Sequence, residues 1–270
     1  MTRIGTSASP SQPSHHWDTV AAAWQQAQPD ALWRAHGDAV NLALLARWLP
    51  PDGAGVLLKT DLFDEAVGDG LYPRLAGAAR PIVGMDVAPA TLKVARAKYH
   101  GLLAVGADVR RLPFADSALE VVVSNSTLDH FDSQDDIVAG LREFHRVLRR
   151  GGELVLTLDN PANPLVALRN ALPFPVLHRL GLVPYPIGAT CGPRRLRRML
   201  RQTGFELRQL TAVMHCPRVI AVAVARAVKR FAPTRSQERF LRFLMNFERM
   251  ENWPTRFLTG HFVAVHAVKP

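Results

Sequence analysis

The sequence is poor in cysteine: its 270 residues include only Cys191 and Cys216. Two cysteines cannot build a disulfide framework, and their spacing fits no zinc-binding pattern, so we expect no metal site and two small buried side chains. No run reaches the roughly 18 uninterrupted apolar residues of a membrane-spanning helix. Met1 to Ser14 is rich in Ser, Thr and Pro and lacks the apolar core of a secretory signal. We therefore expect a cytoplasmic protein with a frayed tail at residues 1–14.

Acidic residues are also scarce relative to basic ones, 23 against 33, which leaves a formal charge of +10. A basic protein can meet nucleic acid, an anionic membrane surface or an acidic substrate. The basic residues are mostly scattered arginines, and their densest group runs from Arg194 to Arg201. This group is typical of the solvated side of an amphipathic helix whose Leu196 and Leu200 face inward. The charge alone therefore does not indicate a nucleic-acid partner.

Short apolar runs alternate with helical patterns from residue 56 onward. The expected strands are Val56–Leu58, Pro81–Asp86, Leu103–Val105, Leu119–Ser124 and Glu153–Leu158. Helices are expected at Ala90–Tyr99 and Ser133–Arg149, the second broken by Gly151 and Gly152. This alternation is typical of a parallel sheet covered on both faces, which binds ligands at the carboxyl ends of its strands. Function should therefore be sought just after each strand.

The rest of the chain extends this core, and we expect one domain over residues 15–270. Residues 15–50 form two helices, at His15–Gln26 and Asp30–Leu49, and residues 160–192 and 212–255 form insertions that cover the substrate. The remaining expected elements are helices Arg194–Gln202, Val219–Phe231 and Gln237–Met250 and strands Phe205–Leu210 and His261–Val268. The helix over Val219–Phe231 allows a peripheral membrane contact. A core position or a homodimer interface is the commoner use of such a segment.

Acidic side chains follow the second and third expected strands. Asp86 ends the second strand, ahead of a helix start at Pro89, where a carboxylate can accept hydrogen bonds from both hydroxyls of a ribose. A helix cap is the alternative role for Asp86. Asp108 follows the third strand and can reach the exocyclic amine of an adenine, while the backbone N–H of Val109 can meet a ring nitrogen. The pattern favours an adenosine-containing cofactor.

Three segments in this order carry a family resemblance: VGMDVAPATLKVARAKY, GADVRRLPFADSALEVVVSNSTLDHF and LREFHRVLRRGGELVLTL. Together they resemble the methyltransferase domain of class I S-adenosylmethionine-dependent enzymes. The resemblance implies a Rossmann-like α/β fold with a seven-stranded, mostly parallel sheet and helices on both faces. It implies S-adenosylmethionine as cofactor and S-adenosylhomocysteine as product. It also assigns Asp86, followed by Val87, to the ribose, Asp108 and Val109 to the adenine, and Asn125 to the methionine side.

The first cofactor motif departs from the family, whose first strand ends in an acidic residue and a glycine-rich loop. In one register Gly68 and Gly70 match the last family glycines and Asp64 becomes the acidic residue. That register needs a central buried strand through Lys59 and Asp61, which is unfavourable. In the other register the strand stops at Leu58 and a glycine-poor loop follows. We favour this second register, in which the cofactor-binding candidates of the first loop are Thr60, Asp61, Glu65 and Gly68.

Methyl transfer from a sulfonium needs alignment and exclusion of water, and a base only where the nucleophile must lose a proton. His130, after the fourth strand, is the candidate base because its neighbours place it beside the expected cofactor site. Asp159, after the fifth strand, and Tyr185 and His215, in the later segment, are candidates for substrate contact. A structural role is the commoner one for any single histidine.

The expected function is methyl transfer to an O, N or C nucleophile of a small apolar or amphipathic metabolite, since the expected cover is mostly apolar. A nucleic-acid methyltransferase is the alternative suggested by the charge. Methylation of a base amino group is disfavoured, because Asn125 is followed by Ser-Thr-Leu and not by Pro-Pro-aromatic. A cofactor-binding protein without activity is the other alternative, suggested by the first loop. No Gly-x-Gly-x-x-Gly follows a strand, which argues against a nicotinamide dehydrogenase.

Overall fold

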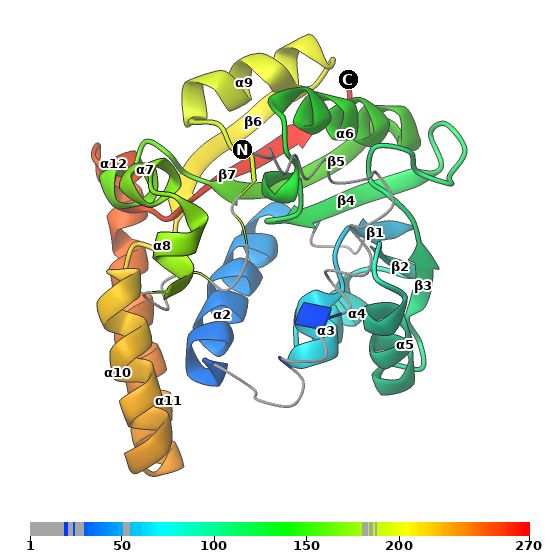
Figure 1. Cartoon of the computed structure of the whole chain (residues 1–270). Helices are drawn as coiled ribbons and strands as arrows, with labels where there is room; N and C mark the ends of the chain where they lie inside the picture. The colour runs from blue at the N-terminus through cyan, green and yellow to red at the C-terminus, as the bar shows by residue number, and fades with distance from the viewer. Residues whose placement is uncertain are drawn as a thin grey trace, which may run out of the picture.

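A computed structural model describes residues 19–20, 24, 30–50, 55–179, 183, 186 and 188–270. Its seven-stranded sheet has the order β3-β2-β1-β4-β5-β7-β6 (Figure 1). The strands are β1 Leu57–Lys59, β2 Ile82–Asp86, β3 Leu103–Gly106, β4 Leu119–Asn125, β5 Leu148–Asp159, β6 Glu206–Val213 and β7 Phe262–Val268. Neighbours among β1 to β5 are parallel, and β7 is antiparallel to both β5 and β6. The expected Rossmann-like, mostly parallel sheet is confirmed.

Helices cover both faces of the sheet, because successive strand residues point to opposite sides. Leu58 and Val122 face α6 (Gln134–Val147) and α9 (Pro193–Gln202) in one core cluster. Leu57 and Val121 belong to the other cluster, with residues of α2 (Ala31–Trp48), α4 (Tyr72–Ala78) and α5 (Pro89–Lys98). Figure 1 shows α6 and α9 on one side of the sheet and α2 on the other. Burial on both faces explains why the central strands are apolar without alternation.

The sequence of α6 explains where this helix begins and which face it buries. The Ser133 side chain caps the helix by accepting a hydrogen bond from the Asp136 backbone N–H at 3.2 Å. Asp135 and Asp136 lie in its first turn, where a negative charge complements the helix dipole. Its apolar residues Ile137 and Phe144 are fully buried against the sheet. The helix therefore fixes the segment between β4 and β5.

Some expected boundaries were wrong. The helix expected to reach Arg149 ends at Val147, because Leu148 already has extended dihedrals (φ −69°, ψ 138°) and pairs with Leu119. β5 therefore begins at Leu148 and turns at Gly151, whose φ is +74°. The expected strand Phe205–Leu210 continues to Val213 as β6. Most of the expected helix His15–Gln26 lies outside the described residues.

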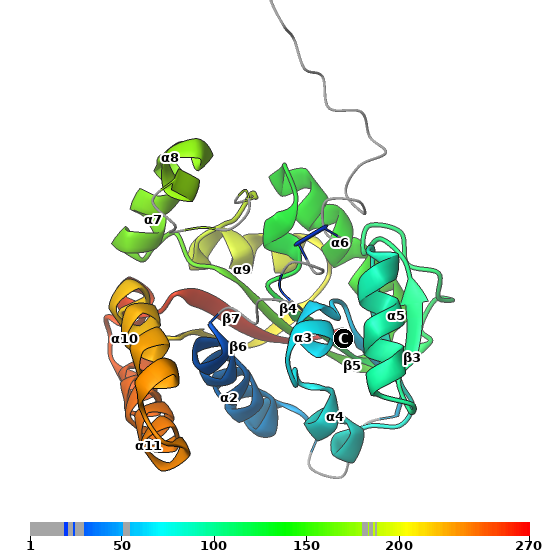
Figure 2. The same ribbon diagram turned by 60° about the horizontal axis from the view of Figure 1, so that its bottom comes forward.

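Two helical insertions follow the strands on the side where β5 ends. The first contains α7 (Pro164–Ala171) and α8 (Phe174–Arg179). The second contains α10 (Arg218–Phe231), α11 (Thr234–Met245), η2 (Asn246–Asn252) and α12 (Arg256–Thr259). Figure 2 shows α10 and α11 side by side next to α2, with which both are in contact. No helix among the described residues is long and apolar enough to cross a membrane.

Candidate functional site

Asp86 ends β2 and lies at the carboxyl edge of the sheet, 9% exposed. Its Oδ2 accepts a hydrogen bond from the Leu62 backbone N–H at 3.1 Å, and its Oδ1 accepts one from the Ala88 N–H at 2.8 Å. Burial raises the pKa of the Asp86 carboxyl, while these hydrogen bonds oppose the shift. A carboxylate has about four lone-pair sites, so the two oxygens keep acceptor capacity for two ribose hydroxyls. The side chain is held in place by backbone on both sides.

β1 ends at Lys59, one residue beyond the end at Leu58 that the second register predicts and short of the Asp61 that the first register needs. The helix α3 (Phe63–Val67) begins four residues later. Thr60 Oγ1 lies 3.0 Å from Ser124 Oγ and 2.8 Å from Thr127 Oγ1, which ties the loop to the end of β4. Leu62 packs directly on Gly84 of β2, where an added Cβ would lie 2.6 Å from Leu62 Cδ2. Gly84 therefore leaves room for the Leu62 side chain to pack on the strand.

Glu65 forms a buried ion pair with Lys59, with 2.8 Å between Lys59 Nζ and Glu65 Oε2. The two residues are 0% and 3% exposed, respectively. The other oxygen, Oε1, accepts hydrogen bonds from the backbone N–H groups of Leu71 at 2.9 Å and Tyr72 at 3.1 Å. Both carboxylate oxygens of Glu65 are thus engaged inside the protein. This geometry does not support the expected contact of Glu65 with the cofactor, and leaves Asp61 as the acidic candidate in the loop.

The neighbouring position Gly68 is the C-cap of α3, with extended dihedrals that other residues also adopt (φ −149°). The glycine that this region needs is Gly70, whose φ is +61°. A Cβ on Gly70 would lie 2.6 Å from the Glu65 carboxyl carbon. The lack of a side chain at Gly70 therefore leaves room for the Glu65 carboxylate of the ion pair. No described contact connects Gly68 with the carboxyl edge of the sheet.

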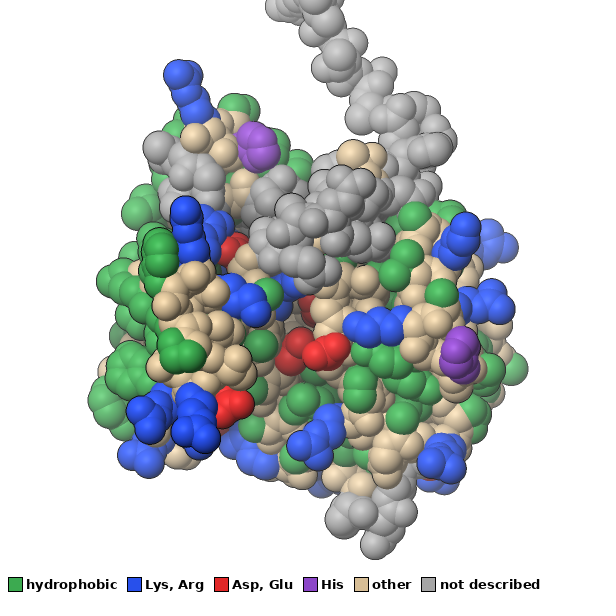
Figure 3. Space-filling view, turned by 90° about the horizontal axis from the view of Figure 1, so that it is seen from below, with side chains coloured by type: hydrophobic (Ala, Val, Ile, Leu, Met, Phe, Trp, Pro, Cys, Tyr) green, Lys and Arg blue, Asp and Glu red, His purple; other side chains and the backbone are tan. Residues whose placement is uncertain are grey.

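Three further carboxyl groups around this loop have raised pKa values. Burial, followed by repulsion from Asp86, raises the pKa of Asp61 to about 6. Burial also raises the pKa of Asp64 to about 6, and that of Asp38 on α2 to about 7. Figure 3 shows acidic side chains gathered at a hollow in the middle of the face seen from below. The concentration of carboxyls gives this hollow a potential that favours a cationic ligand.

The end of β4 carries buried acceptors and a strained residue. Ser126 has a left-handed φ of +49°, and its N–H donates to the Thr157 carbonyl at 3.0 Å. Asn125 Oδ1 and Asp129 Oδ1 are buried and have no hydrogen-bond partner among the described residues. The other oxygen of Asp129, Oδ2, accepts from Ser126 Oγ at 2.8 Å and the Asp159 N–H at 2.9 Å. Unpaired buried acceptors and local strain are the marks of a ligand site, here one that takes a hydrogen-bond donor.

Asp108 lies beyond β3 and is bound by Arg110, with 2.6 Å between Arg110 Nη2 and Asp108 Oδ2. Arg110 also pairs with Asp136 at 2.9 Å, and its guanidinium lies 4.8 Å from the centre of the Phe131 ring. Next to Asp108, the Val109 side chain is 3% exposed and packs in the core. Across the edge, the side chain of Val87 is 38% exposed beside Asp86. The adenine candidates therefore stand together, but Asp108 shares its acceptor sites with Arg110.

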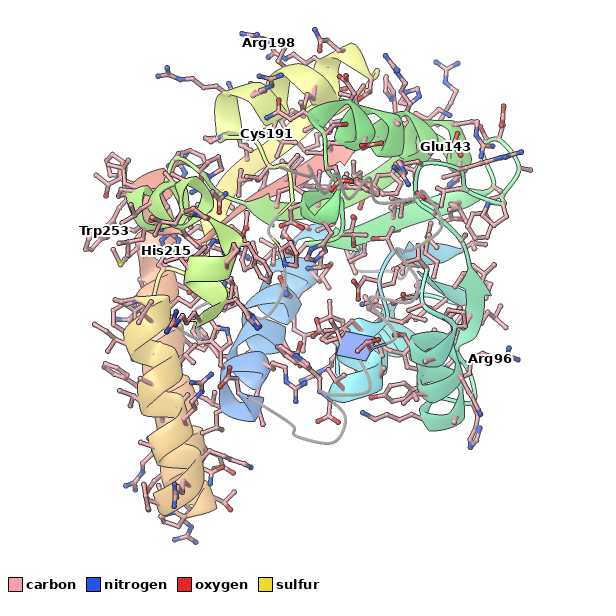
Figure 4. All side chains as sticks on the ribbon, in the orientation of Figure 1. Arg96, Glu143, Cys191, Arg198, His215 and Trp253 are labelled. Carbon is pink, nitrogen blue, oxygen red and sulfur yellow. The ribbon has the colours of Figure 1, made fainter. Side chains whose placement is uncertain are left out.

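The candidates for reaction and substrate contact are placed differently from one another. His130 ends η1 (Leu128–His130), which follows the end of β4 at the carboxyl edge of the sheet. His215 is 4% exposed, and its ring nitrogens contact Thr259 Oγ1 at 2.8 Å and the Ala212 carbonyl at 2.9 Å. Figure 4 shows His215 close to the N-terminal end of α10. These contacts favour the structural role, which is the commoner one for a single histidine. Tyr185 lies outside the described residues.

Asp159 ends β5 in a buried polar cluster that sequence reasoning did not find. Its carboxylate pairs with Arg169 of α7 and lies 3.5 Å from His261 Nε2. The same nitrogen lies 3.4 Å from Arg169 Nη1 and 3.0 Å from Arg218 Nη1 of α10. Burial, helped by the two guanidinium groups, lowers the pKa of His261 well below its usual range, so the imidazole is a neutral acceptor. The cluster joins both insertions to the sheet edge.

Comparisons with known proteins find methyltransferases. A model of a methyltransferase domain matches residues 63–156, from the start of α3 through most of β5, and thus begins just after the glycine-poor loop. With the strand order and the carboxyl-edge site, this match over about a third of the chain supports a class I S-adenosylmethionine-dependent methyltransferase.

Particular relatives are similar over part of their length. A demethylmenaquinone methyltransferase of Chlorobaculum parvum is 31% identical over 42% of this chain and 49% of its own. A malonyl-[acyl-carrier protein] O-methyltransferase of Xylella fastidiosa is 31% identical over 37% of each chain. The chain therefore spans about half the length, or less, of these curated relatives.

Solved structures share the fold at low sequence identity. A putative methyltransferase of Haloferax volcanii, in complex with the Trm112 activator, has a TM-score of 0.60 at 16% identity, covering 93% of this chain and 97% of that one. A geranyl diphosphate C-methyltransferase of Streptomyces coelicolor, solved with S-adenosylhomocysteine, has a TM-score of 0.54 at 15% identity, covering 86% and 79%. These likenesses show the fold.

Proposed function

We propose that this protein transfers a methyl group from S-adenosylmethionine to an O, N or C nucleophile of a small apolar or amphipathic metabolite. The observation that carries the proposal is the carboxyl edge of the sheet, where two backbone N–H groups hold Asp86 after β2. After β4, buried oxygens of Asn125 and Asp129 have no hydrogen-bond partner among the described residues. A ribose and an ammonium group are the partners that these acceptors fit. Both groups belong to this cofactor.

The roles of the chain's own residues follow from this arrangement. When bound, the cofactor supplies an electrophilic methyl group on a sulfonium. Asp86 would hold the ribose, while Asp61, Asn125 and Asp129 would receive the ammonium group. The cover formed by α7 and α10 would exclude water and orient the acceptor. His130 would take a proton where the nucleophile must lose one.

The relatives suggest acceptors to test. Their names specify demethylmenaquinone in one case and a malonyl-acyl carrier protein in another. One acceptor is a lipid-like ring and the other an acidic thioester, and both fit the amphipathic class. The exposed leucines of α7, Leu165 at 65% and Leu168 at 59%, favour an acceptor with an apolar part over a nucleic acid. Peripheral membrane contact and a homodimer are the two remaining uses for apolar surface on the cover.

Calorimetry and a methylation assay test this function in turn. We expect S-adenosylmethionine and S-adenosylhomocysteine to bind at micromolar to submillimolar concentration, and a reduced quinone analogue to accept the radiolabelled methyl group. Absence of binding at millimolar cofactor would contradict the proposal at its first step. RNA and DNA serve as comparison acceptors, and a nucleic-acid enzyme would reveal itself by affinity that falls steeply with salt.

A cofactor-binding protein without transfer activity is the second candidate. The observation that favours it is the first loop, where the buried Lys59–Glu65 pair takes the place of glycines. This candidate predicts cofactor binding with no turnover of any acceptor. Turnover of one acceptor that is lost in Asp86→Ala would remove it.

A further inference from the structure

α10 carries an apolar stripe that no other described part of the chain covers. Its small residues Ala221 and Ala225 are buried, and Ala221 packs in a cluster with side chains of α2 and α11. On the opposite side, Val219 is 65% exposed, Ile220 66% and Phe231 78%. At 100° per residue these side chains, with Val224, lie within an arc of roughly 140°. Arg230 is the single charged residue of α10 within this arc, so the exposed face is largely apolar, which is unusual on a surface helix.

The neighbouring helix α11 presents charge beside this stripe. Arg235, Arg239 and Arg242 are exposed, and Phe243 between them and the end of the helix is 55% exposed. From Arg218 to Met245 the chain has seven basic residues and a single acidic one, Glu238. Figure 3 shows hydrophobic and basic side chains mixed along the side of the molecule formed by this pair. Arg226 pairs with Asp30 and Arg218 contacts His261, so the remaining five basic residues supply the positive charge of this outward surface.

The stripe begins beside the buried polar cluster that contains Asp159 and His261. Arg218, the first residue of α10, lies 3.0 Å from His261 Nε2, and Arg169 of α7 lies 3.4 Å from the same atom. α7 also exposes Leu165 and Leu168. The two helices that expose apolar side chains, α7 and α10, thus both contact His261.

We propose that the outward face of α10 and α11, with the exposed leucines of α7, rests on an anionic phospholipid membrane. Helices with an apolar face beside basic residues lie in the plane of such interfaces, with aliphatic side chains in the acyl boundary and arginines at the head groups. A symmetric pairing of two copies through this face would bring their positive charges together. Nucleic acid would use the arginines and leave the aliphatic stripe in water. Charge and apolarity together therefore select the membrane.

Vesicle flotation with the full chain tests this surface. We expect binding to phosphatidylcholine vesicles that contain phosphatidylglycerol, weaker binding to phosphatidylcholine alone, and release by salt. Ile220→Ser/Val224→Ser/Phe231→Ser should weaken binding at least about tenfold through lost apolar burial. Arg235→Gln/Arg239→Gln/Arg242→Gln should weaken it about 100-fold, at about fivefold for each charge. Leu103→Ser is the matched control, since Leu103 is also 55% exposed but lies on β3 at one end of the strand order.

Several outcomes would overturn the inference. One is that the wild-type protein does not bind the vesicles. Another is that both triple variants, shown to be folded by circular dichroism, bind as well as the wild type. A stable dimer in light scattering that the serine variant dissociates would assign the face to a second copy, and RNA binding lost only in the glutamine variant would assign it to nucleic acid. The proposal does not depend on methyl transfer. Cofactor calorimetry on the same samples separates the two, since each measurement can fail while the other succeeds.

Discussion

Asp86 is the side chain on which cofactor affinity should depend most. Its two oxygens already accept the N–H groups of Leu62 and Ala88, so the carboxylate cannot turn away from the ligand. Asp86→Asn removes the charge and replaces one acceptor with a donor. We expect the dissociation constant for S-adenosylmethionine to rise about 10- to 100-fold, as for the loss of a charge-assisted hydrogen bond. Calorimetry measures it, with exposed Asp132→Asn as the control. An unchanged constant would place the ribose elsewhere.

Asp38 should make the stability of the protein depend on pH. Burial first, and then Asp64 and Glu65, raise the pKa of Asp38 from 3.8 to about 7. The folded state therefore binds more protons than the unfolded state between these values, and the free energy of unfolding falls as pH rises through this window. Asp38→Asn removes that loss, so it should exceed the wild type by about 1–2 kcal/mol near pH 8 and match it near pH 4. Urea unfolding measures this at pH 4 and pH 8. The same difference in free energy of unfolding between Asp38→Asn and the wild type at both pH values would contradict the inference.

At the scale of the element, the loop from β1 to α4 is held by the buried Lys59–Glu65 pair. Lys59→Met leaves the Glu65 carboxylate buried without its cation, which should lower the free energy of unfolding by about 3–5 kcal/mol. Lys59→Met/Glu65→Gln should cost less than the sum of the single changes, because neither partner is left charged. Urea unfolding of the wild type, Lys59→Met, Glu65→Gln and the double variant measures the coupling free energy.

The surface pair between Arg47 and Glu251 is the matched comparison for this cycle. Its closest distance is 2.9 Å, against 2.8 Å for the buried pair, but the Arg47 side chain is 50% exposed. Arg47→Met should therefore cost about 0–1 kcal/mol. Equal costs for Lys59→Met and Arg47→Met would contradict the assignment of the buried pair as the anchor of the loop.

The elements also show what the sequence could predict. Strands β2 to β5 were predictable, because buried strands leave a local apolar pattern, while the cofactor roles of Asp86, Asp108 and Asn125 stay predictions. The pairing of Glu65 with Lys59 was not predictable, since it depends on the path of the loop through Gly70 and not on local sequence. The cluster of Asp159, Arg169, Arg218 and His261 brings together four separate parts of the chain. No local pattern signals such a meeting.

At the scale of the whole molecule, both thiols lie inside. Cys191 packs in the core beside α9, and Cys216 packs near α10, each less than 5% exposed. Burial raises the pKa of Cys191 to about 11 and that of Cys216 to about 12. We expect neither thiol to react with Ellman's reagent in the native protein at neutral pH, and both to react after unfolding. Rapid titration of one thiol in the folded state would contradict this, and a reductant should leave the unfolding midpoint unchanged.

The antiparallel course of β7 has a practical consequence for handling the protein. β7 starts opposite Asp159, at the edge that carries the candidate site, and Val268 pairs with Glu153 at the other end of β5. The last residue therefore emerges on the far side of the sheet from the site. A biotin or affinity handle attached there would tether the molecule to a sensor with its binding edge turned toward solution. Ligand and vesicle binding measured on the sensor should then be directly comparable with binding measured in free solution.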